Sequence, residues 1–132
     1  MKEPAVIRVE RVFAHPPARV WQALTDPALH AQWWAAGDVR PVVGHRFELD
    51  MGRWGMQPCE VVAVEQERLL SYTFAGMSTI TWRLEPEGAG TRFTLIQDGF
   101  DLDSPIARQA YEGMGRGWPA VIAGIDRVLA AA

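Results

Sequence analysis

With 132 residues, of which 48% are hydrophobic and 22% charged, the chain has the composition of a soluble globular protein and not of a disordered one. The length suits one hydrophobic core, so we expect residues 1–132 to form a single domain. Thirteen basic and sixteen acidic residues give a net charge of −3 with no basic cluster, and a nucleic-acid partner is therefore not expected.

The single cysteine, Cys59, excludes an internal disulfide and a multi-cysteine metal site. No apolar run approaches the roughly 18 residues that a membrane span needs. The first ten residues lack the apolar stretch of a secretory signal. We therefore expect a cytoplasmic protein without a membrane partner.

The first elements are predicted to be a strand and two short helices. Residues 5–13 alternate between apolar and charged side chains, which is typical of a half-buried strand. The Pro16-Pro17 pair ends the strand, and Pro17 suits the first turn of a helix over 17–25. Asp26 is placed to cap a second short helix over 27–34.

Between residues 37 and 97 the sequence changes to short alternating segments separated by turns. One face of each segment is apolar, which predicts half-buried strands joined as an antiparallel meander. These segments are marked by Phe47, Leu49 and Met51, by Cys59 to Glu65, by Leu70, Tyr72 and Phe74, by Ile80, Trp82 and Leu84, and by Phe93, Leu95 and Gln97.

Ser104 followed by Pro105 predicts the start of a helix that runs to the C-terminus, with apolar residues every three or four positions. Gly113, Gly115, Gly117 and Pro119 interrupt the pattern, because an interior glycine costs about 0.5–1 kcal/mol and an interior proline about 3 kcal/mol. Two interpretations stay open. The helix breaks into a short and a longer part, or it kinks where it crosses a bulky group.

Several short motifs are arranged in a characteristic order along the chain. They are Val9 to Pro16, Val20 to Pro27, the pair Trp33-Trp34, Thr91 to Leu95 followed by Gln97 to Phe100, and Gly117-Trp118. Their order resembles the START-like helix-grip (SRPBCC) superfamily of polyketide cyclases and pollen-allergen-like ligand-binding proteins. The nearest resemblance is to homologues of the activator of the heat-shock-protein ATPase.

The resemblance implies an α+β helix-grip fold, with two short helices after the first strand. A curved antiparallel sheet of six to seven strands would wrap round the long C-terminal helix, the only element long enough to cover its apolar face. Members of the superfamily often carry His-Glu-Gly-Phe where this chain has Gln97-Asp98-Gly99-Phe100. Glutamine does not titrate near neutral pH, so any acid–base role of that histidine is absent here.

Such a fold encloses space between sheet and helix, which either a ligand or the protein's own side chains fill. The residues predicted to line it are mostly apolar, as small-molecule sites are. We expect Tyr72, Trp82 and Gln97 to orient a ligand and the methionines to make the walls adaptable. The predicted ligand-binding residues are Phe47, Leu49, Trp54, Met56, Cys59, Tyr72, Phe74, Ile80, Trp82, Phe93, Leu95, Gln97, Met114 and Trp118.

No arrangement of residues in the sequence predicts catalysis or a cofactor. His15, His30 and His45 lie on separate elements without metal-ligand spacing, and we expect them at the surface. Cys59 has no flanking basic residue to lower its pKa and is expected to be a small buried hydrophobe. We therefore predict no catalytic residue, no metal and no cofactor.

Three functions remain open. The first is a carrier or sensor, monomeric or homodimeric, that binds a small hydrophobic molecule of aromatic or lipid-like character without catalysis. The second is a polyketide-cyclase-like enzyme that acts in the same cavity, with Tyr72 or His45 positioning a carbonyl. The third is a protein-interaction module of the chaperone-ATPase-activator kind, which predicts an exposed apolar patch.

Overall fold

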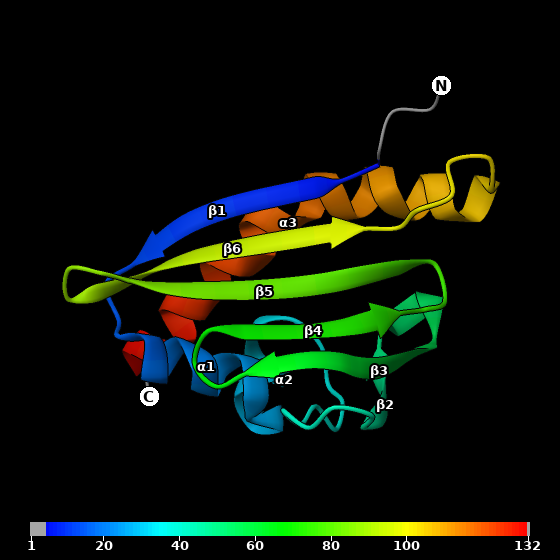
Figure 1. The fold of residues 1–132 in the computed structure, drawn as a ribbon. Helices are drawn as coiled ribbons and strands as arrows, with labels where there is room; N and C mark the ends of the chain where they lie inside the picture. The colour runs from blue at the N-terminus through cyan, green and yellow to red at the C-terminus, as the bar shows by residue number, and fades with distance from the viewer. Residues whose placement is uncertain (1–4, 132) are drawn as a thin grey trace.

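The computed structural model describes residues 5–131, and within them the chain forms a six-stranded sheet and three α-helices (Figure 1). The strands are β1 (Ile7–Phe13), β2 (Arg46–Asp50), β3 (Met56–Glu65), β4 (Leu69–Phe74), β5 (Ser78–Glu87) and β6 (Gly90–Asp98). The helices are α1 (Pro17–Thr25), α2 (Pro27–Trp33) and α3 (Pro105–Ala131), and a short 3-10 turn covers Gly52–Trp54.

The sheet is antiparallel throughout, with the spatial order β1-β6-β5-β4-β3-β2. Strands β2 to β6 follow one another as the predicted meander, whereas β1 pairs with the last strand, so that Ile7 lies opposite Gln97 and Phe13 opposite Thr91. The sheet is curved and open. The predicted α+β helix-grip architecture is therefore confirmed, with six strands.

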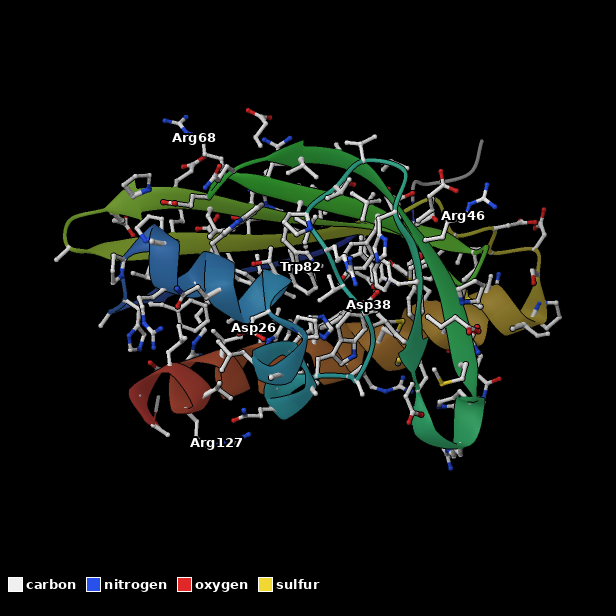
Figure 2. All side chains as sticks on the ribbon, turned by 90° about the horizontal axis from the view of Figure 1, so that it is seen from below. Asp26, Asp38, Arg46, Arg68, Trp82 and Arg127 are labelled. Carbon is white, nitrogen blue, oxygen red and sulfur yellow. The ribbon has the colours of Figure 1, made fainter. Side chains whose placement is uncertain are left out.

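All three helices lie on the concave side of the sheet, which we call the inner face (Figures 1 and 2). Helix α3 packs against β1, α1 and α2. Where α1 meets α3, the core is largely aliphatic. Val20 and Leu24 of α1 are buried there together with Ile125 and Leu129 of α3. This packing fixes the end of α3 that lies beside α1.

Local signals placed the helix starts correctly. The Asp26 side chain accepts a hydrogen bond from the Ala28 N–H at 2.9 Å, and Ser104 Oγ accepts one from the Ala107 N–H at 3.3 Å. Of the two interpretations of the last helix, the break is wrong, because α3 continues from Pro105 to Ala131 with Pro119 inside it. Side chains on either side of the proline are buried on the sheet side, and their burial offsets the cost of the missing N–H donor.

Among residues 5–131, no helix combines the length and hydrophobicity needed to cross a membrane.

Candidate functional site

The inner face of β4, β5 and β6 presents large side chains towards α3. Tyr72 and Trp82 are fully buried there, and Trp118 of α3, which meets them from the other side, is 2% exposed. Figure 2 places Trp82 between the sheet and the helices, whereas Arg68 lies beyond the sheet on its other side. Strand alternation accounts for this arrangement, because every second side chain of a strand points to the same face.

Two hydrogen-bonded groups run through this interior. The Trp82 indole N–H donates to the Tyr72 hydroxyl oxygen at 3.0 Å. The Trp118 indole N–H donates to Gln97 Oε1 at 2.8 Å, and Gln97 Nε2 donates to Ser78 Oγ at 3.0 Å and to Met114 Sδ at 3.4 Å. The side chains predicted to orient a ligand thus hydrogen-bond to partners within the protein.

Trp34, at the C-terminal end of α2, occupies the centre of the aromatic cluster. Its ring lies 4.8 Å from the Trp118 ring, 6.0 Å from Phe74 and 6.1 Å from Trp82, measured between centroids. Trp82 also meets Trp118 edge to face at 5.4 Å. The space that the fold encloses at this level is filled by the protein's own rings.

The ionisable groups buried in this region are neutral near pH 7. Burial raises the pKa of the Tyr72 phenol far above its usual range and raises that of the Cys59 thiol to about 12. Burial also lowers the pKa of His30 to about 4, although the hydrogen bond to the Ala35 carbonyl opposes this shift. Desolvation disfavours the charged form in all three cases.

His30 lies in the interior and not at the surface as predicted, with no exposed area. Its Nδ1 lies 2.6 Å from the Ala35 carbonyl oxygen, which only accepts, so Nδ1 carries the proton. Nε2 is then an acceptor, and it has no partner among residues 5–131. The ring packs between Trp33 and Trp34, with centroids at 5.1 and 5.3 Å, because α2 lies against α3 and not on the solvent side.

The other predicted site residues divide into two groups. Seven of them are buried and part of the core: Phe47, Leu49, Cys59, Phe74, Ile80, Phe93 and Leu95. Trp54 and Met56 lie instead at the hairpin between β2 and β3, where they are 56% and 52% exposed. There the Arg53 guanidinium stacks on the Trp54 ring at 4.8 Å, away from the interior cluster.

A groove of about 550 Å³ lies on the opposite, outer face of the sheet, and we call it the outer groove. Its lining residues are Arg46, Phe47, Glu48, Pro58, Cys59, Glu60, Thr73 and Gly76. Three of these residues are charged, and Arg46 Nε donates to Glu60 Oε1 at 3.0 Å across β2 and β3. The groove is open to solvent and does not reach the aromatic cluster, because Phe47 and Cys59 point their side chains inwards.

The remaining histidines are half-buried and separate from the cluster. His15 Nε2 lies 3.0 Å from Asp126 Oδ1, and His45 stacks on Phe47 while its Nε2 lies 2.7 Å from the Asp38 carbonyl oxygen. Within residues 5–131, no three His, Cys, Asp or Glu side chains gather as a group that could hold a metal ion.

Sequence reasoning missed Trp33, Trp34, His30 and Ser78 as interior residues. The adjacent tryptophans at the end of a helix could have indicated interior positions. Consecutive side chains of a helix point in different directions, so each of the two indoles needs its own place in the fold. Trp33 is anchored by its indole N–H, which donates to the Ala23 carbonyl at 2.7 Å, and its ring meets Trp82 at 5.6 Å, whereas Trp34 contacts Trp118.

The arrangement of sheet and helices is that of helix-grip proteins, and a family profile agrees with it. The profile of the activator of Hsp90 ATPase homolog 1-like proteins matches residues 14–130. The chain therefore belongs to this family. No curated protein matches it significantly.

Solved structures share the fold of this chain. Protein MLL2253 from Mesorhizobium loti is 37% identical, with a TM-score of 0.85 over 96% of this chain and 98% of that one. Protein BH1534 from Bacillus halodurans is 27% identical, with a TM-score of 0.81 over 94% and 96%. DynU16, described as a putative protein in the dynemicin biosynthetic locus, shares the fold at 23% identity, with a TM-score of 0.77 over 95% of this chain and 47% of that one.

Proposed function

We propose that this chain binds a small, flat, apolar molecule between the inner face of the sheet and α3, as a carrier or sensor without catalysis. The observation that carries the proposal is the position of Trp34. Its ring lies between Phe74, Trp82 and Trp118, where a bicyclic ligand would find three aromatic walls. Bound ligand would replace this ring, and the transfer free energy would come from apolar burial of roughly 25 cal/mol per Å².

Trp34 is held less firmly than the neighbouring indoles. The indole N–H groups of Trp33, Trp82 and Trp118 each donate a hydrogen bond, whereas that of Trp34 has no acceptor in residues 5–131. The Trp34 ring is half-buried and held by ring contacts, which contribute about 0.5–1.5 kcal/mol each beyond their burial. Its displacement therefore breaks no hydrogen bond.

The backbone on both sides of Trp34 is fixed, so the motion is a rotation of the side chain. The Trp34 N–H donates to the His30 carbonyl at 3.0 Å, and the Ala36 carbonyl accepts from the Asp50 N–H at 2.8 Å. At Gly37 the chain bridges to Leu49, and an added Cβ would lie 2.3 Å from the Glu48 carbonyl oxygen. Rotation about the side-chain bonds opens the site without unfolding this segment.

The protonation states of the buried ionisable side chains favour a binding function over a catalytic one. His30, Tyr72 and Cys59 are the buried ionisable groups, and all are neutral near pH 7, far from the matched pKa that efficient acid–base catalysis needs. The exposed large apolar side chains, among them Val43, Trp54 and Ile106, are spread over separate segments, which favours an interior ligand over a docked protein.

We further propose that the protein works in the cytoplasm, as a monomer or homodimer and without a cofactor. The free, buried thiol of Cys59 supports a reducing compartment.

The test is a titration with N-phenyl-1-naphthylamine, a neutral dye that fluoresces in apolar surroundings. We expect saturable one-to-one binding to the unmodified protein. If the open arrangement is populated at about 10% or less, Trp34→Ala tightens binding about tenfold or more, because the ring no longer competes for the site.

Trp54→Ala is the matched control, since it removes an indole from the exposed hairpin and should leave the dissociation constant unchanged. The proposal is wrong if the unmodified protein shows no saturation, or if Trp54→Ala abolishes binding while Trp34→Ala leaves it unchanged.

A further inference from the structure

The Tyr72 hydroxyl carries a hydrogen atom that nothing in the described protein accepts. The Trp82 indole N–H can only donate, so in the 3.0 Å hydrogen bond between them the tyrosine oxygen is the acceptor. No other hydrogen bond of this hydroxyl occurs within residues 5–131, and Tyr72 has no exposed area from which water could serve. A buried donor without an acceptor is costly, and its persistence calls for an explanation.

Of the polar groups near Tyr72 on the sheet, Gln97 has no capacity left and Ser78 has only a hydrogen to offer, whereas the unused acceptor described above, His30 Nε2, belongs to α2. Gln97 is fully used, with Oε1 accepting from Trp118 and Nε2 donating to Ser78 and Met114. Ser78 Oγ accepts from Gln97, and its own hydrogen also has no acceptor in the described chain. On the inner face of β4 and β5, the hydroxyl groups of Tyr72 and Ser78 thus each have a hydrogen left to donate.

The surroundings determine which acceptor would fit. Tyr72 packs edge to face against Phe47 at 5.3 Å and adjoins the ring of Trp82, which lines the Trp34 position. Within residues 5–131, the buried polar side chains are His30, Ser71, Ser78, Thr91, Thr94 and Gln97, none of them cationic near pH 7. A carboxylate or phosphate would be desolvated there without a counter-charge, which is strongly unfavourable.

We propose that the ligand is a neutral, flat, apolar molecule with a carbonyl oxygen that accepts a hydrogen bond from the Tyr72 hydroxyl. This inference rests on the proposed function and narrows it to carbonyl compounds such as cyclic aromatic ketones. Because burial keeps the phenol protonated, Tyr72 remains a donor across the physiological pH range. The hydroxyl then distinguishes such ketones from hydrocarbons of the same shape.

The test compares 1-indanone with indane, two bicyclic molecules that match the size of an indole and differ by the carbonyl group. Their dissociation constants are measured by displacement of N-phenyl-1-naphthylamine, for the unmodified protein, for Tyr72→Phe and for Tyr111→Phe. The ratio of the indane to the indanone constant is compared between proteins, so differences in water solubility cancel. Tyr111, the only other tyrosine, packs against Phe100 outside the cluster and is the matched control.

We expect the ratio to fall about two- to tenfold in Tyr72→Phe, as the loss of one net hydrogen bond implies. It should stay unchanged in Tyr111→Phe. In the unmodified protein, the infrared carbonyl stretch of bound indanone should lie below its position in hexane, a reading that does not depend on the folding of any variant.

This inference is overturned if both probes bind, the ratio is the same in Tyr72→Phe as in the unmodified protein, and the carbonyl stretch of bound indanone stays at its position in hexane. The proposed binding function then stands. If neither indane, indanone nor the dye binds, the proposed function fails, and this inference with it.

Discussion

The two faces of the sheet are built from the same strands and yet differ in every property that matters for a ligand. The inner face is buried, aromatic and uncharged, and the hydroxyl hydrogens of Tyr72 and Ser78 have no acceptor among residues 5–131. The outer groove has a volume of about 550 Å³, and exposed ions such as the Arg46–Glu60 pair line it. Exposed ion pairs of this kind contribute little, about 0–1 kcal/mol. The proposed site is therefore placed by the buried hydroxyls and the aromatic rings of the inner face, and not by the volume of the groove.

Neighbouring residues of β5 offer the sharpest test of this contrast. Leu84 points inwards and is 2% exposed, so Leu84→Ala should lower the free energy of unfolding by about 2–5 kcal/mol through lost burial and a residual cavity. Urea denaturation followed by tryptophan fluorescence measures the loss. A change below 1 kcal/mol would show that the inner face is loosely packed at this point.

The buried His30 side chain predicts that the free energy of unfolding depends on pH. An ordinary histidine takes up its proton near pH 6.5, whereas folded His30 does so at about pH 4. Between these values the unfolded state binds more protons, so the free energy of unfolding falls as the pH is lowered, by up to about 3 kcal/mol across the window.

The control for this prediction is His30→Asn, whose amide can replace the Nδ1–H donor to the Ala35 carbonyl but does not titrate. Urea midpoints between pH 7 and 4 should fall less steeply in the variant than in the unmodified protein. Parallel pH profiles would mean that His30 is already accessible to protons in the folded state.

The smallest effect is expected one residue from Leu84, on the outer face. Arg83 is exposed, and Arg83→Ala should change the free energy of unfolding by no more than about 0.5 kcal/mol. A loss as large as that of Leu84→Ala would remove the distinction between the two faces. The same denaturation experiment reads both variants.

The sequence alone determined the features that depend on neighbouring residues. The alternation along β5 assigned Ile80, Trp82 and Leu84 to one face, and Asp26 and Ser104 marked two helix starts. These features could be predicted because strand alternation and helix capping act over two to four residues.

Only the tertiary structure decided the features that depend on distant contacts. Helix α3 continues through Pro119 because Trp118 and Ile122 are buried against the sheet, which no local propensity can register. His30 is buried because α2 lies against α3, and Trp34 fills the interior because rings from β4, β5 and α3 converge on it. The Tyr72–Trp82 hydrogen bond likewise exists only because the register of β4 against β5 brings the two side chains together, and among residues 5–131 the tyrosine hydrogen has no acceptor.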